Sequence, residues 1–222
     1  MKKFTILICI TLLIVFSGCS GCSDNEPNFD VVSNNVTIWE DSTGGYSIIL
    51  ALEVSNLINA PLHFKESDFD IVDETGTVIE TMNSVSAYPP VVKRSEVAVY
   101  YDAKTSDRIS DANVKLKAIP HIETEKSKIK GEAVGTTGAT TGGSLYADVL
   151  VHNASSRNEY NNVHIAVISR KSNNEVVSVM TGTIDSIKPR EELEIRVEDR
   201  LKQRNLGADI VTKYQLFSYL DP

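Results

Sequence analysis

Cysteine is almost absent from this chain of 222 residues. Its 3 cysteines, Cys9, Cys19 and Cys22, lie near the start, and none follows residue 22. This absence excludes a body held together by disulfides or by a cysteine-ligated metal. The body must be held by apolar cores, which domains of about 100 residues can form. The length left after a leader allows two such domains.

Basic residues are too few for a protein that binds nucleic acid. The chain has 22 Lys and Arg against 30 Asp and Glu, a net charge of −8. Residues 28–122 hold 7 basic and 14 acidic side chains (−7), whereas residues 123–222 hold 13 and 14 (−1). Phosphate backbones and anionic lipid surfaces attract concentrated positive charge, so we expect neither as a direct partner. The asymmetry indicates either different partners for the two parts or simply a solvated acidic surface.

The sequence also lacks the common catalytic motifs. It has no G-x-S-x-G elbow, no H-E-x-x-H pair, no phosphate-binding glycine loop and no dinucleotide fingerprint. An enzyme needs clustered Asp, Glu or His in a cleft, and the linear sequence offers no such order. We therefore predict a protein that is not an enzyme and has no cofactor.

A single long apolar run is present, and it lies at the amino terminus. Lys2 and Lys3 precede the uncharged run Phe4–Phe16. This run suits a signal peptide and is short for a membrane-spanning helix, which needs about 20 residues. The chain continues as Phe16-Ser17-Gly18-Cys19. This sequence resembles the lipobox of bacterial and some archaeal lipoproteins, although Phe16 stands where Leu is usual.

The lipobox resemblance implies that residues 1–18 are a signal peptide and that Cys19 is diacylated. Two acyl chains are enough for stable anchoring. We therefore expect an exported protein held by lipid at the outer face of the cell membrane or in the cell envelope, with residues 19–27 as lipidated cysteine and tether. The alternative is an ordinary cleaved signal with an incidental cysteine. Cys19 and Cys22 also spell C-x-x-C, but no βαβ pattern and no second cysteine pair accompany them, so we expect no redox or zinc site there.

One stretch of the chain occurs twice. Thr43–Asn56 reads TGGYSIILALEVSN and Thr141–Asn153 reads TGGSLYADVLVHN, a spacing of about 97 residues, within the size of one sandwich domain. Apolar residues alternate with others in both copies, which predicts strands with one buried face and one less buried face. The residues expected on the buried faces are Tyr46, Ile48, Leu50, Leu52 and Val54 in the first copy and Leu145, Ala147, Val149 and Val151 in the second. The predicted fold class is all-β, with two tandem immunoglobulin-like β-sandwich domains at 28–122 and 123–222 after the lipoprotein signal peptide.

Further strands are predicted where short apolar runs alternate with turn signals. In the first repeat these are Val31–Trp39, Phe69–Val72, Thr77–Ile79, Glu96–Tyr101 and Asn113–Ile119. Asp73-Glu74-Thr75-Gly76 predicts a hairpin loop with Gly76 at a positive φ. In the second repeat the predicted strands are Lys128–Thr136, Val163–Ile168, Glu175–Met180, Leu193–Val197 and Ile210–Leu220. We expect Thr137–Gly143 to be a loop rich in Gly and Thr, and Glu198–Asn205 to form one or two helical turns.

An acidic cluster surrounds the predicted hairpin of the first repeat. Its members are Glu66, Asp68, Asp70, Asp73 and Glu74, of which the three aspartates are the candidate calcium ligands. Hard carboxylate oxygens suit calcium, but the cluster lacks the D-x-D-x-D-G order of a known calcium loop. The favoured interpretation is a polar hairpin end with outward-facing strand positions.

Two histidines of the second repeat are the other candidates for a metal site. His152 and His164 lie on successive predicted strands and face each other if the connecting hairpin, centred near Asn158, is symmetric. Asp148 is four residues from His152 on the same strand, about 13 Å by strand rise, so it cannot share the same ion. Two histidines alone make a poor site, and half-buried strand residues are the favoured interpretation.

Several segments of the chain resemble known domains of surface proteins. In the second repeat they are Val151-His152-Asn153-Ala154-Ser155, Asn162-Val163-His164-Ile165-Ala166-Val167, Asn174-Glu175-Val176-Val177 and Ile187-Lys188-Pro189-Arg190-Glu191. These segments resemble the FxLYD-type immunoglobulin-like domains of bacterial and archaeal surface lipoproteins, although the aromatic-x-Leu-Tyr-Asp signature reads Val167-Ile168-Ser169-Arg170-Lys171 here. The first repeat looks like the related telokin-like domains of unknown function through Val54-Ser55-Asn56, Phe69-Asp70-Ile71 and Glu74-Thr75-Gly76. The resemblances imply a fold and a surface location and bring no catalytic residues.

The sequence as a whole favours a non-catalytic, membrane-anchored cell-surface lipoprotein that acts as a protein-binding, envelope-binding or structural module. Loops at one end of a sandwich are the usual recognition surface, and Asp41–Gly45 and Thr137–Gly143 are the candidates. The alternative is a ligand- or metal-binding lipoprotein that delivers to a transporter, which predicts a pocket between the repeats. Sandwich folds host many functions, so the fold does not separate these two hypotheses.

Overall fold

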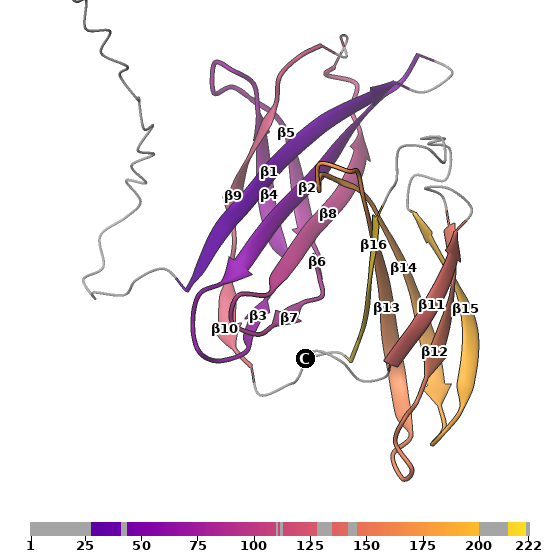
Figure 1. Ribbon diagram of the computed structural model, residues 1–222. Coiled ribbons are helices and arrows are strands. Elements are labelled where there is room, and N and C mark those ends of the chain that lie inside the picture. Colours follow the sequence, from indigo (N-terminus) through magenta and orange to yellow (C-terminus); the bar gives the residue numbers. More distant parts are fainter. Residues whose placement is uncertain are drawn as a thin grey trace, which may run out of the picture.

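The structure is a computed structural model that describes residues 28–40, 44–109, 111, 113–127, 135–141, 146–199 and 213–220. These ranges are all-β, as predicted, with strands that pair only in antiparallel fashion and with no helix (Figure 1). Within the same ranges no helix is long and apolar enough to span a membrane. The predicted signal peptide, Cys19 and the tether lie outside the described residues. So do residues 200–205 of the expected helical turns, whereas Glu198 and Asp199 belong to a strand.

The first half of the molecule, residues 28–127, contains three sheets. Two of them, with strand orders β1-β2-β8-β6 and β5-β4-β9, enclose an apolar core, and a small third sheet has the order β10-β3-β7. The strands are β1 (Phe29–Glu40), β2 (Tyr46–Asn56), β3 (Leu62–Phe64), β4 (Ser67–Val72), β5 (Val78–Val85), β6 (Ala87–Tyr88), β7 (Val91–Val92), β8 (Val97–Thr105), β9 (Lys117–His121) and β10 (Thr124–Lys126). The predicted boundary between residues 122 and 123 falls just before β10, which pairs with β3 of this half.

The second half, described at 135–141, 146–199 and 213–220, forms one sheet in the order β11-β12-β15-β14-β13-β16. Its strands are β11 (Gly135–Thr141), β12 (Tyr146–His152), β13 (Tyr160–Arg170), β14 (Val176–Ile187), β15 (Glu192–Asp199) and β16 (Lys213–Tyr219). Strands β14 and β15 pair at two positions only, Met180 with Asp199 and Thr181 with Glu198. The order β1-β2-β8 of the first half recurs here as β11-β12-β15, and β5-β4-β9 recurs as β14-β13-β16.

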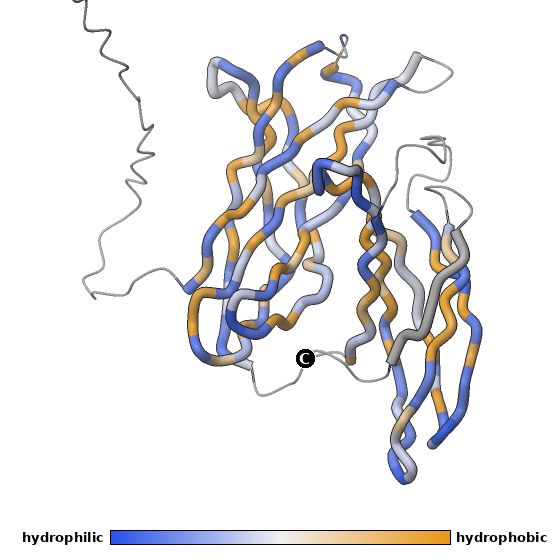
Figure 2. Tube along the Cα trace, in the orientation of Figure 1, coloured by the Kyte–Doolittle hydropathy of each residue, from blue (hydrophilic) through white to orange (hydrophobic). Residues whose placement is uncertain are grey.

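Each half has its own apolar core, built from the alternating residues of its strands. The inward residues Ile48, Leu50, Leu52 and Val54 of β2 are fully buried, as are Ala147, Val149 and Val151 of β12. These residues confirm most of the faces predicted from the period-two pattern; Tyr46 is only partly buried, and Leu145 lies outside the described residues. Figure 2 shows hydrophobic positions along the strands and hydrophilic residues at several hairpin tips.

The same hairpin loop occurs once in each half. Asp73 N–H donates to the carbonyl of Thr77 at 3.1 Å between β4 and β5, and Lys171 N–H donates to the carbonyl of Glu175 at 2.9 Å between β13 and β14. The residue that turns the chain has a positive φ in both loops, 86° at Gly76 and 69° at Asn174. Gly and Asn are the residues that adopt this conformation most readily. The hairpin predicted at residues 73–76 is confirmed.

A buried asparagine also occurs once in each half, at the end of β2 and at the end of β12. The Asn56 amide donates to the carbonyls of Ala60 and Val92 at 2.8 and 2.9 Å, and its side-chain oxygen accepts from the N–H of Ile58. The Asn153 amide donates to carbonyls at three positions, Asn158, Ile187 and Lys188, and its oxygen accepts from the N–H of Ser155. Both side chains are fully buried, so these bonds satisfy groups that water cannot reach.

The turns to which the two asparagines are hydrogen-bonded, at residues 93–96 and 188–191, also have the same form in both halves. Lys93 N–H donates to the Glu96 carboxylate at 2.8 Å, and Lys188 N–H donates to the Glu191 carboxylate at 2.7 Å. The residue before each glutamate has a positive φ, 65° at Ser95 and 64° at Arg190. The recurrence therefore extends from strand order to individual hydrogen bonds.

The outer side of the edge strand β1 is tied to the other sheet of the first half by one side chain. The amide of Asn34 donates to the carbonyl of Ala118 at 2.7 Å, and its oxygen accepts from the N–H of Ala118 at 3.2 Å. The Asn34 amide thus takes the place of a neighbouring strand's backbone. It links β1 to β9, which belongs to the opposite sheet.

Two sequence-based expectations about strand positions are wrong. A loop is expected from residue 137, but residues 135–141 form strand β11. The strand forms because pairing with β12 supplies backbone hydrogen bonds that a Gly-rich segment does not make by itself. The strand expected at Asn113–Ile119 starts only at Lys117, and Val114 is exposed. In both cases tertiary pairing, rather than local composition, sets the ends of the strand.

Candidate functional site at the junction between the two halves

The two halves meet through a shared apolar layer, separate from their own cores. This layer joins the outward face of β2, β6 and β8 to the outward face of β13, β14 and β16, which stand beside β8 in Figure 1. Its buried members are Ile49, Ala51, Tyr88, Val99, Tyr101, Ala166, Ile168, Val176, Val179 and Tyr219. The single tryptophan, Trp39, packs against its margin. The second face of β2 is therefore buried as well, and the expectation of a less buried face is wrong because the second half covers it.

One buried polar contact crosses this layer. The Tyr101 hydroxyl of β8 donates to the Asp199 carboxylate of β15 at 3.3 Å, although the two residues are 98 positions apart. Ser178 of β14 donates to the same carboxylate oxygen. Asp199 is 1 % exposed, so these donors replace the water that the carboxylate lost on burial.

A second polar contact joins the two halves at the edge of the layer, nearer the surface. The Arg170 guanidinium lies 2.6 Å from the Glu53 carboxylate, and the two side chains are 13 % and 12 % exposed. Ser33 donates to the other oxygen of Glu53 at 2.8 Å. A charge-assisted pair of this kind fixes orientation as well as contributing energy. The linear sequence gives no signal for this ion pair, because each residue finds its partner on the other half of the chain.

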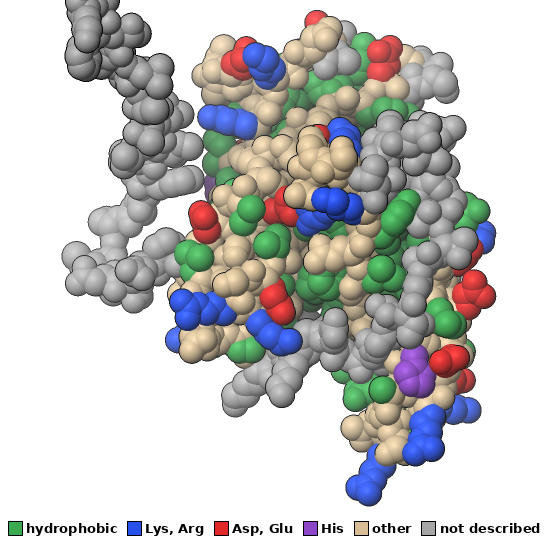
Figure 3. All heavy atoms as spheres, in the orientation of Figure 1, with side chains coloured by type: hydrophobic (Ala, Val, Ile, Leu, Met, Phe, Trp, Pro, Cys, Tyr) green, Lys and Arg blue, Asp and Glu red, His purple; other side chains and the backbone are tan. Residues whose placement is uncertain are grey.

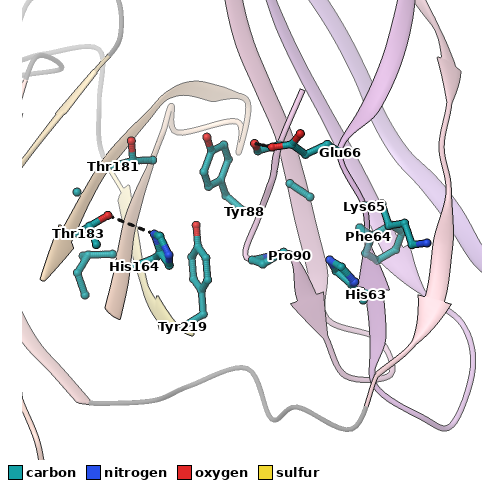
Figure 4. A pocket seen from close by; sticks show the side chains of 14 residues that line it. His63, Phe64, Lys65, Glu66, Tyr88, Pro90, His164, Thr181, Thr183 and Tyr219 are labelled. Atoms are coloured by element: carbon teal, nitrogen blue, oxygen red, sulfur yellow. Dashed lines mark hydrogen bonds between the residues drawn. The ribbon is translucent and has the colours of Figure 1, made fainter. Parts of the chain in front are cut away.

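A hollow of about 440 Å³ opens beside the shared layer, lined by both halves. Figure 4 shows His63, Lys65 and Glu66 of the first half on one side and His164, Thr183 and Tyr219 of the second half on the other. The His164 ring stacks on Tyr219 with 5.4 Å between ring centroids, and its Nδ1 lies 3.2 Å from the Thr183 hydroxyl. These contacts hold the second-half wall of the hollow in place.

The first-half wall of the hollow carries paired charges. His63 Nδ1 and Lys65 Nζ lie 3.0 and 3.1 Å from the two carboxylate oxygens of Glu125 on β10. The hydrogen bond from His63, followed by that from Lys65, lowers the pKa of the Glu125 carboxyl below its usual range. This hollow offers hydroxyls, aromatic rings and a few charged groups, the mixture that small-ligand sites use.

A second hollow of about 560 Å³ lies at the side of the junction where Arg170 and Glu53 meet. Its other charged lining residues are Lys93 and Glu96 of the first half. Figure 3 shows Lys and Arg side chains interspersed with Asp and Glu over the described part of the face it draws. The junction thus carries mixed charge, with no concentration of one sign on that face.

The structure keeps the candidate histidines of the second half apart. Strand β12 pairs with β11 and β15, whereas β13 pairs with β14 and β16, so His152 and His164 do not face each other across a hairpin. His152 lies 3.5 Å from Glu192 of β15, and His164 lines the first hollow. The expected facing is wrong because the chain crosses from one set of strands to the other after Asn153.

The candidate calcium ligands are each engaged by neighbouring groups. Asp68 accepts the N–H of Ser84, and Asp73 accepts the N–H groups of Thr75 and Thr77 within its own hairpin loop. Asp70 accepts from the Thr81 hydroxyl at 2.8 Å and lies 3.0 Å from His121 Nε2. The hydrogen bond to His121 is the main reason that the pKa of Asp70 is lowered, and the hydrogen bond donated by the Thr75 hydroxyl does the same for the pKa of Asp73. Among the described residues no group of three or more His, Cys, Asp or Glu is placed to hold a metal.

Asp148, the carboxylate considered beside His152, is bound to an arginine. The Arg196 Nε and Nη2 atoms lie 2.7 and 2.8 Å from its two oxygens, and the guanidinium lies over the Tyr146 ring at 4.2 Å. This bidentate bond lowers the pKa of Asp148.

Neither a family model nor a curated protein matches the chain. The resemblances to lipoproteins and to immunoglobulin-like domains therefore stay predictions, and the junction is the candidate functional site on its geometry alone.

Proposed function

We propose that this protein is a non-catalytic lipoprotein of the cell surface, whose two immunoglobulin-like domains form one stiff body on a short lipid-anchored tether. The body binds or positions a protein or a polymer of the cell envelope. One observation carries the proposal: the halves share a buried apolar layer that is crossed by the Tyr101–Asp199 contact and edged by the Arg170–Glu53 contact. Layers of this kind resist bending far better than a flexible linker does.

The division into two similar domains is supported by recurrence at two levels. The strand orders β1-β2-β8 and β5-β4-β9 return in the second half. The buried amides of Asn56 and Asn153 make the same kinds of bond to the same turn. Both features are what a pair of related sandwich domains at residues 28–122 and 123–222 predicts.

The anchor is tested first, because the proposal depends on it. Replacing Cys19 by Ser in the full chain removes the acylated sulfur, and the protein is expected to move from the membrane fraction to the soluble exported fraction. A Cys22→Ser variant is the matched control and should stay with the membrane. A Cys19→Ser protein that remains in the membrane fraction would contradict the lipoprotein part of the proposal.

Partner binding is tested by crosslinking in the intact envelope. Exchange of residues 41–45 and 142–143, which belong to the recognition segments predicted at Asp41–Gly45 and Thr137–Gly143 and exclude β11, is expected to remove the crosslinked partner or polymer. Exchange of residues 155–158 after β12, at the other end of that strand, is the control and should leave it. A binding role is contradicted when both exchanges leave every crosslink unchanged.

A second function, capture of a small ligand for delivery to a transporter, is favoured by the 440 Å³ hollow at the junction. Its hydroxyl, aromatic and charged groups come from both halves, as the pocket expected between the two repeats requires. The test is a thermal-unfolding panel with metals, sugars and small solutes. A ligand at 100 times its dissociation constant adds about 2.7 kcal/mol to the free energy of unfolding. The shift should disappear in a Thr183→Val variant, and the absence of any shift across the panel contradicts this second function.

A further inference from the structure

The junction joins two unlike surfaces. We define face I of a half as the outward face of its β1-β2-β8 or β11-β12-β15 strands, and face II as the outward face of its β5-β4-β9 or β14-β13-β16 strands. The shared layer packs face I of the first half, through Ala51 and Tyr101, against face II of the second half, through Ile168 and Val179. Face II of the first half and face I of the second half are the two faces outside the junction.

The recurring register shows which residues of the outer face I correspond to those in the junction. Counting back from Asn56 and Asn153 along the matching strands places Asp148 where the first half has Ala51. The strand pairing confirms this: Ala51 lies opposite Tyr101, and Asp148 lies opposite Arg196. The first pair is buried, with 4 % and 2 % exposure, whereas the Arg196 side chain is 54 % exposed. A small apolar residue and a tyrosine are thus replaced by a bidentate ion pair.

The outer face II differs from its buried counterpart in the same way. Ile168 lies opposite Val179 in the second half, and the corresponding pair in the first half is Asp70 opposite Thr81. The pair Ala166 and Phe217 likewise corresponds to Asp68 and His121. Asp68 and His121 are exposed, and Asp70 is held between Thr81 and His121. At these four positions apolar side chains have been replaced by two aspartates, a threonine and a histidine, whereas Leu150 on the outer face I and Ile119 on the outer face II are exposed apolar residues.

A contact between unlike faces uses one face of each kind and leaves the other kind free on each unit. Each added unit would present a fresh copy of the same two faces, so the packing would continue as an open chain of units. Charged side chains on the two outer faces oppose this, because burying even a paired charge against an apolar face costs desolvation that the pairing does not fully offset. Arrays built from stacked units use polar outer faces on their terminal units in this way.

We propose that the charged side chains on the outer faces, Asp148–Arg196 at one end and Asp70–His121 at the other, are end caps that hold the array at two units. The partner that would fit each outer face, once its charges are removed, is the complementary face of another copy of this chain. The inference concerns how the body ends and is independent of what the body binds.

The test copies the residues of the junction onto the outer faces of the full chain. The face I variant carries Asp148→Ala and Arg196→Tyr, and the face II variant carries Asp68→Ala, Asp70→Ile, Thr81→Val and His121→Phe. Native mass spectrometry of the protein released from detergent is expected to show each variant alone as a monomer. An equal mixture of the two should show a complex of twice the mass, and the chain that carries both sets should show a ladder of larger assemblies.

The matched control removes the charges of face I without making that face apolar, with Asp148→Asn and Arg196→Gln, and it should stay monomeric in the mixture. The inference is overturned when both variants unfold cooperatively, as the unchanged protein does, and their mixture is still monomeric. Self-association of the face I variant alone also overturns it, because two copies of face I are not complementary.

A reverse experiment keeps the inference testable where a face variant fails to fold. Ala51→Asp with Tyr101→Arg places the outer-face residues inside the junction. The halves should then separate, and the fluorescence of Trp39, the single tryptophan, should move to longer wavelength as it gains water. An unchanged emission spectrum in a folded variant would show that these residue types do not prevent docking, and this overturns the proposal.

Discussion

Strands β2 and β12 occupy the same place in the two halves and end on the same buried asparagine, yet only one of them is buried on both faces. Ile49 and Ala51 of β2 are buried against the second half, whereas β12 places Tyr146 and Asp148 outward beside Arg196. The inward faces and the turns of the two strands are alike. The same framework of strands and turns can therefore have either a buried or a solvent-exposed outward face, and only the outward residues need to differ.

The largest expected effect on stability comes from placing a residue type of the exposed outer face at the corresponding buried position of the junction. Ile168→Asp puts into the shared layer the residue type that Asp70 has at the corresponding exposed position. We expect it to lower the free energy of unfolding by about 3–5 kcal/mol, because the carboxylate is buried without a partner. Urea denaturation checks this, with Ile168→Val as a control that costs about 1 kcal/mol. Asp70→Ile should change stability little. Equal losses of unfolding free energy from Ile168→Asp and from Asp70→Ile would contradict the contrast between the buried and the exposed position.

The next prediction tests whether the buried asparagines, which make similar hydrogen bonds in the two halves, contribute similarly to stability. Asn56→Ala and Asn153→Ala each leave buried carbonyl and N–H groups without their hydrogen bonds. Each should cost about 2–3 kcal/mol of unfolding free energy, measured by urea denaturation. Asn173→Ala, at an exposed hairpin tip, is the control. A large loss for one asparagine and none for the other would show that the shared turn matters in only one half.

The hairpin loops and the inward faces could be predicted from the sequence because their signals are local. Gly76 marks a positive-φ turn, and the alternation around Leu50 and Val149 indicates a pleated strand. The junction could not be predicted, because burial of Ile49 and Ala51 depends on a surface that the chain supplies much later. The expected His152–His164 facing fails for the same reason, since the strand that follows β12 in sequence does not pair with it.

A smaller effect separates the two arginine–carboxylate pairs. Double-mutant cycles with Arg170→Met and Glu53→Gln should give a coupling energy of about 1–3 kcal/mol, since both side chains are largely shielded from water. The same cycle on Arg196 and Asp148 should give a smaller coupling that falls further as salt is added, because exposed pairs are screened. Equal coupling energies and equal salt dependence would contradict the contrast between junction and outer face.

The smallest predicted effect is a pH dependence of stability that arises from Asp70 on the outer face II. His121 and Thr81 lower the pKa of Asp70 in the folded protein from its usual value of 3.8. A lowered folded-state pKa stabilises the fold above the usual value, and this contribution is lost as the pH falls through the lowered value. Below pH 4 the unchanged protein should therefore lose stability more steeply than an Asp70→Asn variant does. Acid titration followed by circular dichroism checks this, and parallel curves for the two proteins would count against it.

The Asn34 amide, which bonds both backbone groups of Ala118, has a consequence for how the protein ages in solution. A strand 12 residues long at the edge of a sheet is a template on which other extended chains can assemble. The amide occupies part of that template with the chain's own β9. The onset of fibril growth in concentrated solution should then be governed by how often β9 lifts away from β1, and not by the much rarer unfolding of the whole body.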